Sequence, residues 1–241
     1  MADCRASRAS SLPSLSAVLA RGDVWCGDVL PTLPAGTIPT GYPELDAELP
    51  GGGWPMGNLT EILVDRSGLG ELSLLMPALA RLSADGGKLV LVAPPYLPYP
   101  PGWAVAGVAP EHLLVVHPGR QLAWCIEQLL KSGGFAGLLA WPGSIDAKQL
   151  RRLQVAAEGQ AIFAALWRST AVATTPSPAA LRLTLSADDD TLLLRILKRR
   201  GRPASRPLRI SIPRPVKQHE VVVGPAFPPV AAGSPVVAAA A

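Results

Sequence analysis

The sequence predicts an α/β fold in which a mainly parallel sheet continues into antiparallel strands toward its C-terminal end. Two observations lead to this prediction. Between residues 59 and 167, short apolar runs alternate with segments of helical periodicity, which is typical of parallel strands joined by helices. After residue 180, three short apolar runs follow one another without a helical segment between them, which favours consecutive antiparallel strands.

Apolar periodicity assigns the elements of the alternating region. Uninterrupted apolar runs predict strands, and the run at residues 88–93 suits a strand that is buried on both faces. Leucines at helical spacing predict the first helix, which contains Pro77 and is therefore expected to kink or to start early. The expected strands are residues 59–64, 88–93, 112–116, 137–141 and 161–167, and the expected helices span residues 72–82, 120–134 and 146–157.

Turn and capping residues mark several boundaries between these elements. Asp146 can accept hydrogen bonds at the start of the last expected helix, and the glycines at 133–134 can end the helix before it. Asp188–Asp190 separate two late apolar runs and predict a hairpin turn. Two Pro-rich stretches, residues 30–40 and 96–101, are expected to be connectors, the second with polyproline II conformation.

Composition divides the 241 residues into three parts. Hydrophobic residues make up 49% of the chain, which is ample for a core, and we expect one domain over residues 37–214. Residues 1–36 are expected to form a flexible segment with a short helix, and the Pro- and Ala-rich residues 215–241 a disordered tail. Since neither a long apolar span nor a secretory signal is apparent, we expect a cytoplasmic protein without membrane contact.

Cysteine, histidine and tryptophan residues were considered as candidate site residues. The three cysteines form no CxxC pair and the three histidines lack metal-ligand spacing, so no metal, cofactor or catalytic residue is expected. Trp124 and Trp141 lie in apolar contexts and are expected in the core. Trp54 and Trp103 lie in Gly/Pro turns, where a packed loop anchor is favoured over an exposed interface residue.

Positive charge is concentrated in one late segment. Residues 191–217 hold nine basic residues and no acidic residue, within a chain whose net charge is +4. Arg195 and Arg209 alternate with apolar residues, as on the solvent face of a strand. A second group clusters around a glycine in a turn, and we predict that it contacts a protein partner or DNA, with a merely solvated surface as the alternative. This group consists of Lys198, Arg199, Arg200 and Arg202.

The junction after the strand at residues 59–64 lies where an α/β protein would bind phosphate. A P-loop reads G-x-x-x-x-G-K-[ST], and of its fixed positions Gly70 matches the second glycine. Asp65 replaces the first glycine, Glu71 the lysine that neutralises phosphate, and Leu72 the hydroxyl residue that holds Mg²⁺, while Gly68 is an additional glycine. We therefore predict a degenerate P-loop that binds no nucleotide.

Two further elements of phosphoryl-transfer chemistry are missing from the expected strand ends. The strand at residues 137–141 ends in Trp141, where a Walker-B strand would end in aspartate. The strand at residues 88–93 is followed by prolines and Tyr96, where a catalytic glutamate would be expected. The sequence thus predicts a protein that is not an enzyme and disfavours an active ATPase.

Several segments resemble the ATPase core of the RecA family. Thr40-Gly41 followed by Leu45-Asp46, and then the segment LPGGGWPMG at residues 49–57, resemble the part of RecA that leads into the P-loop strand. Residues 195–200 look like the late basic strand of RecA. The resemblance covers about residues 37–213 and implies a three-layer RecA-like core, although the two loops that bind DNA in RecA look short here.

Among RecA-like proteins without ATP-binding residues, the sequence is most similar to the ImuA family. This resemblance implies an accessory protein in SOS-induced, error-prone translesion synthesis, associated with the nucleoid after DNA damage. Its implied partners are an ImuB-like Y-family adaptor, RecA, and indirectly an error-prone C-family polymerase. The matching segments are Val24-Trp25, LDAELPGGGWPMG at residues 45–57, residues 68–72, LVAPPYLPYPP at residues 91–101 and ILKRRG at residues 196–201.

The resemblance also implies where partners bind. In RecA the late basic strand lies near the subunit interface, so by analogy Lys198, Arg199, Arg200 and Arg202 are expected to contact RecA, an acidic segment of the adaptor or DNA phosphate. The alternative function is that of SulA, a related SOS inhibitor of cell division that binds FtsZ. SulA proteins are shorter than this chain and lack its ILKRRG region.

Overall fold

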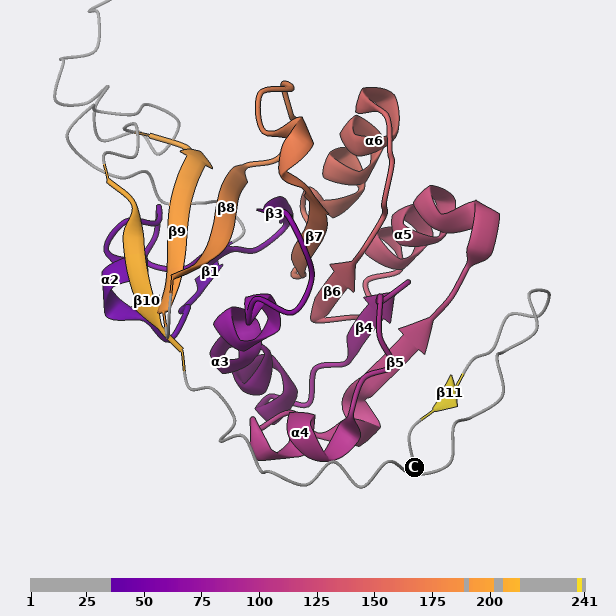
Figure 1. Ribbon diagram of the computed structural model, residues 1–241. Helices are drawn as coiled ribbons and strands as arrows, with labels where there is room; N and C mark the ends of the chain where they lie inside the picture. The colour runs from indigo at the N-terminus through magenta and orange to yellow at the C-terminus, as the bar shows by residue number, and fades with distance from the viewer. Residues whose placement is uncertain (1–35, 189–190, 202–205, 213–237, 240–241) are drawn as a thin grey trace, which may run out of the picture.

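A nine-stranded sheet forms the centre of the part of the chain that the computed structural model describes, residues 36–188, 191–201, 206–212 and 238–239 (Figure 1). In the order β10-β9-β8-β3-β7-β6-β4-β5-β11, the strands from β8 to β5 are parallel, and those at both edges pair antiparallel. This confirms the predicted α/β fold. The strands are β3 (Asn58–Val64), β4 (Leu89–Val92), β5 (Leu113–Val116), β6 (Gly137–Ala140), β7 (Phe163–Ser169), β8 (Leu181–Asp188), β9 (Thr191–Lys198), β10 (Leu208–Ser211) and β11 (Ala238–Ala239).

Helices cover both faces of this sheet and complete a three-layer arrangement (Figure 1). Helices α2, α3 and α4 pack on one face, and α5 and α6 pack on the other. The helices are α2 (Pro43–Asp46), α3 (Glu71–Ala84), α4 (Pro100–Val105), α5 (Leu122–Lys131) and α6 (Ala147–Ala157).

Each face of the sheet has its own apolar core, and β4 contributes to both. Leu89 and Leu91 belong to the core beneath α3, whereas Val90 and Val92 belong to the core beneath α5 and α6. All four side chains are at most 1% exposed. Because successive residues of a strand point to opposite faces, an uninterrupted apolar run is what a strand between two helical layers requires.

A second, two-stranded sheet precedes the main one. Strands β1 (Thr37–Ile38) and β2 (Trp54–Pro55) pair antiparallel. A Cβ atom on Gly53 would lie 2.3 Å from the carbonyl oxygen of Ile38, so this close approach requires glycine. The prediction of an irregular connector is therefore wrong at residues 37–38, while residues 30–35 lie outside the described part of the chain.

The segment between β1 and β2 is held against α3 by a glycine and a tyrosine. A Cβ atom on Gly41 would lie 2.4 Å from the Cβ of Pro77, so the ring of the helical proline packs directly on this glycine. The Tyr42 hydroxyl donates a hydrogen bond to the Ser73 carbonyl oxygen at 3.2 Å, and burial raises the pKa of Tyr42, with the charge of Glu44 acting in the same direction. Pro77 thus lies within α3, which begins at Glu71.

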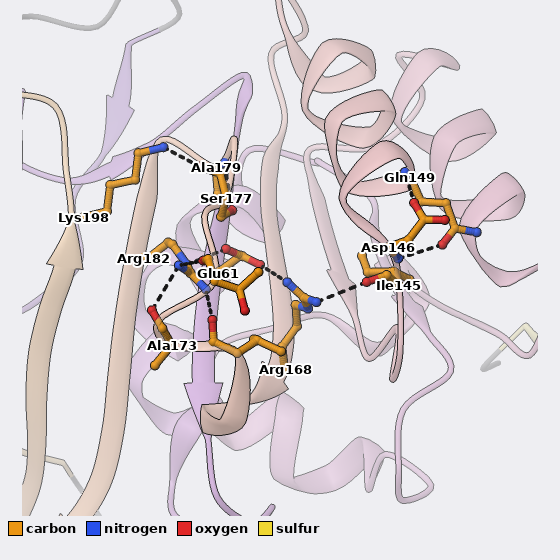
Figure 2. Close-up of polar contacts among 12 residues, drawn as sticks. Glu61, Ile145, Asp146, Gln149, Arg168, Ala173, Ser177, Ala179, Arg182 and Lys198 are labelled. Atoms are coloured by element: carbon orange, nitrogen blue, oxygen red, sulfur yellow. Dashed lines mark hydrogen bonds and ion pairs between the residues drawn. The ribbon is translucent and has the colours of Figure 1, made fainter.

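The predicted caps of α5 and α6 are confirmed. The Asp146 carboxylate accepts a hydrogen bond from the Gln149 amide nitrogen at 2.7 Å, and the Gln149 side chain accepts one from the Asp146 amide nitrogen at 3.0 Å (Figure 2). Gly133, just beyond the end of α5, has a φ of +64°, which glycine adopts most readily.

The tryptophans follow the predictions with one exception. Trp54 and Trp103 are 0% and 5% exposed and are packed as expected, although the structure places them in β2 and α4 rather than in turns. Trp124 is 57% exposed, so its expected place in the core is wrong. Ile126, two residues later, is buried. Because each residue turns an α-helix by about 100°, Trp124 lies nearly on the opposite side of α5.

Three further predictions concern the second Pro-rich stretch, the two ends of the chain and membrane contact. The expected polyproline stretch is wrong at its end, because Pro100 is the first residue of α4, a position where its fixed φ suits a helix. The expected flexible segment and tail lie outside the described part of the chain except at residues 36 and 238–239, where the last two form β11 and pair with β5. No helix in the described ranges is long and apolar enough to cross a membrane.

Candidate functional site

The loop between β3 and α3 lies at the carboxyl end of the parallel strands, where α/β proteins bind ligands. Gly68 and Gly70 have φ values of +85° and +96°, so both use the left-handed region. A Cβ atom on Gly70 would lie 2.3 Å from the Cδ1 atom of Ile212, which packs against the loop from just beyond β10. The loop therefore has the compact glycine turn of a phosphate-binding loop, but is closed on one side by an apolar side chain.

Glu71 occupies the inside of this turn. Its Oε1 atom accepts a hydrogen bond from the Gly68 amide nitrogen at 3.0 Å, and the residue is 5% exposed. Backbone N–H groups in such a turn are the donors that usually meet a phosphate oxygen. Here the Glu71 carboxylate accepts a hydrogen bond from one of these N–H groups.

The second oxygen of this carboxylate faces a different environment. Glu71 Oε2 is buried and has no hydrogen-bond partner among the described residues. It belongs to a residue that lines a cavity of about 250 Å³ between the start of α3 and the segment after β4. The other walls of this cavity, which we call the β4 pocket, are mainly apolar and include Leu72, Leu91, Pro94, Tyr99, Trp103 and Trp141.

Trp141 fills the end of β6, where an aspartate would hold a metal ion in an ATPase. Its ring stacks on that of Trp167 from the neighbouring strand β7, with centroids 4.5 Å apart and planes inclined by 9°. Trp141 lines the pocket with apolar surface, and the buried ring of Trp167, a residue that is 3% exposed, supports it from behind. Trp141 thus lines one cavity with four of the residues expected at the degenerate P-loop: Gly68, Gly70, Glu71 and Leu72. The fifth, Asp65, does not line it and accepts a hydrogen bond from the Thr170 hydroxyl.

A buried cluster of charges lies in the three adjacent strands β8, β3 and β7 (Figure 2). Glu61 of β3 is 0% exposed and pairs with Arg168 of β7 and Arg182 of β8, each with an N–O distance of 2.7 Å. We call these residues the Glu61 triad. A carboxylate at this depth is compatible with folding because two guanidinium groups compensate its charge.

The two arginines of the triad also hold the connections that follow β6 and β7. Arg168 donates to the Ile145 carbonyl oxygen at 3.2 Å, just before α6. Arg182 donates to the carbonyl oxygens of Val172 and Thr175 at 2.8 and 2.7 Å, in and after the short helical turn η3 (Thr170–Val172). These two connections are the ones that look short in the sequence when they are compared with the DNA-binding loops of RecA. The triad therefore fixes them to the sheet.

The residues of the late basic group differ in their exposure to solvent. The Arg199 guanidinium is 2% exposed and pairs with the Glu48 carboxylate at 2.7 Å, and it also donates to the Glu48 carbonyl oxygen. The Arg199 side chain is therefore engaged in a contact within the chain, and its expected contact with a partner stays a prediction. Lys198 and Arg200 are exposed, whereas Arg202 lies outside the described residues.

Lys198 is nevertheless coupled to the Glu61 triad. Its Nζ atom donates to the Ser177 carbonyl oxygen at 2.6 Å (Figure 2). Partial burial lowers the pKa of Lys198, and the positive charges of Arg182 and Arg200 lower it further, whereas Glu61 acts against them. The exposed charges at the end of β9 thus lie beside the end of the triad.

Part of the chain is similar in sequence to a known protein. No family model matches the chain. It is 32% identical over 131 residues to the protein RecA of Thermus aquaticus, a match that covers 54% of this chain and 38% of that RecA. The chain is a distant, partial relative of RecA.

The likeness to RecA agrees with the fold. The mostly parallel sheet, the helices on both faces and the late antiparallel strands form a RecA-like α/β fold. The match spans less than two fifths of that RecA, so it does not show that this chain has the activity of the whole RecA protein.

Sequence reasoning found the loop and the basic group of this RecA relative but missed the Glu61 triad. A signal was present, since Glu61 interrupts an apolar run that predicts a fully buried strand. A charge in such a strand requires an opposite charge nearby. Arg168 and Arg182 stand 107 and 121 positions after Glu61 in the sequence. They lie next to it because β7 and β8 are the two neighbours of β3 in the sheet.

Proposed function

We propose that this chain is a non-catalytic accessory protein of a DNA-damage response, with error-prone translesion synthesis as its setting. The observation that carries the proposal is the Glu71 carboxylate, which accepts the Gly68 N–H inside the glycine turn. The similarity to RecA supports a role related to DNA damage, and the ImuA-like segments favour translesion synthesis. Its action is through contacts with an ImuB-like adaptor and with RecA.

Purified chain is expected to bind no ATP. Glu71 and Asp65 both place negative charge at the loop, where repulsion of a triphosphate is worth about 4 kcal/mol for unit charges 4 Å apart at an effective dielectric constant of 20. The measurement is a titration with a fluorescent ATP analogue and Mg²⁺, read by anisotropy. Absence of saturation at millimolar nucleotide supports the proposal, and saturable binding at micromolar nucleotide contradicts it.

The partners are tested by affinity capture from DNA-damaged source cells, with the full chain as bait. The Lys198→Ala/Arg200→Ala double variant is expected to recover much less of the ImuB-like adaptor and of RecA than the unchanged chain does. Both side chains are exposed, so their removal changes the surface and leaves the core intact.

A matched control removes the same charge elsewhere. Lys148→Ala/Arg151→Ala changes two exposed basic residues of α6 and is expected to leave recovery unchanged. Recovery of FtsZ without the adaptor or RecA would contradict the proposal and favour a SulA-like inhibitor of cell division. Binding of the purified chain to DNA that weakens steeply with salt, and less steeply in the Lys198→Ala/Arg200→Ala variant, would assign these residues to DNA phosphate instead.

A further inference from the structure

We infer that the β4 pocket binds an arginine side chain that a partner protein presents on an extended apolar segment. This inference concerns a different surface from Lys198 and Arg200. It shares with the proposed function one condition, that nucleotide does not occupy the pocket, and this condition is measured separately by the ATP titration.

The first argument is the charge of the pocket. Among the described residues that line it, Glu71 is the one that carries a charge. Its Oε2 atom is buried, in a residue that is 5% exposed, and finds no hydrogen-bond partner within the part of the chain that the structure describes. A buried carboxylate oxygen without a donor is unfavourable, and a cationic N–H donor compensates both its hydrogen bond and its charge.

The second argument is the nature of the walls. The rings of Tyr96, Tyr99, Trp103 and Trp141 line the pocket, together with prolines and leucines. Aromatic faces attract cations, and the planar guanidinium group also stacks on them. The methylene stem of an arginine can pack on the apolar residues while its head reaches the carboxylate. Arginine therefore fits this combination better than lysine, whose strongly hydrated ammonium group does not stack.

The third argument is the size of the pocket and its rim. A cavity of about 250 Å³ lies below the 300–1,000 Å³ of typical small-molecule sites and suits one long side chain. At its rim Tyr96, Leu97 and Tyr99 are 72%, 84% and 70% exposed. Large apolar side chains exposed side by side are typical of protein-binding surfaces, where tyrosine is enriched. The occupant is therefore part of a protein rather than a free small cation.

The test starts from a random peptide library selected on the full chain, with the Tyr96→Ala/Tyr99→Ala variant used to remove peptides that bind elsewhere. Enriched peptides are expected to share an arginine. One such peptide is then synthesised twice, with arginine and with its neutral isostere citrulline. For the unchanged chain, we expect citrulline to weaken binding about tenfold or more, which corresponds to about 1.4 kcal/mol.

The Glu71→Gln variant completes a double-mutant cycle. If arginine meets Glu71, both peptides bind this variant weakly and differ little from each other. The matched control Glu111→Gln makes the same change at an exposed residue outside the pocket and is expected to retain the preference for arginine. Circular dichroism of each variant verifies that it is folded.

Three results would overturn the inference. The first is enrichment of peptides without a basic residue, and the second is equal binding of the arginine and citrulline peptides to the unchanged chain. The third is an arginine preference that persists in Glu71→Gln. Saturable binding of ATP would contradict the proposed function but leaves the peptide measurements interpretable, because they are made without nucleotide.

Discussion

Replacing Glu61 by alanine is expected to lower the free energy of unfolding by about 3–5 kcal/mol. The carboxylate is fully buried and is paired with two arginines that are 9% and 5% exposed. Its removal leaves two guanidinium groups in the sheet without their counter-charge. The measurement is a urea unfolding curve followed by tryptophan fluorescence.

Two controls separate this effect from a general loss of charge. Glu48→Ala removes the partner of Arg199 from a pair whose carboxylate side chain is 27% exposed, and we expect a smaller loss. The triple variant Glu61→Leu/Arg168→Met/Arg182→Met removes all three charges together and is expected to recover part of the stability. A loss below about 1 kcal/mol in Glu61→Ala would mean that the triad does not stabilise the sheet.

Replacing Trp54 by alanine is expected to lower the free energy of unfolding by about 3–5 kcal/mol. Trp54 is 0% exposed, and its ring lies 5.9 Å from that of Phe163, centroid to centroid. It joins the two-stranded sheet β1–β2 to the start of β7, so the substitution opens a cavity between them. Chemical denaturation measures the loss.

The matched control is Trp124→Ala. Its ring is 57% exposed on α5, so we expect a change within about 0.5 kcal/mol, as is usual for surface positions. Equal losses in the two variants would contradict the assignment of Trp54 as a packed residue. A pair of substitutions with the same chemistry therefore separates burial from residue type.

Much of the secondary structure could be predicted from local patterns. The alternation of leucine and valine in β4, the caps at Asp146 and Gly133, and the helical leucines of α3 all follow from periodicity and backbone preference. The errors fall where a neighbour distant in sequence decides. Residues 37–38 become a strand because residues 54–55 lie beside them, and Trp124 is exposed because α5 turns Ile126 toward the sheet.

The fold class and the composition of the loop before α3 follow from local sequence, because apolar periodicity and the identity of Glu71 and Leu72 are local properties. The tertiary structure sets which charges meet. It brought Arg168 and Arg182 to Glu61, turned Arg199 inward to Glu48, and left one oxygen of Glu71 unpartnered among the described residues. The physical reason is that a charge pair depends on strand order and burial, which no short segment of sequence contains.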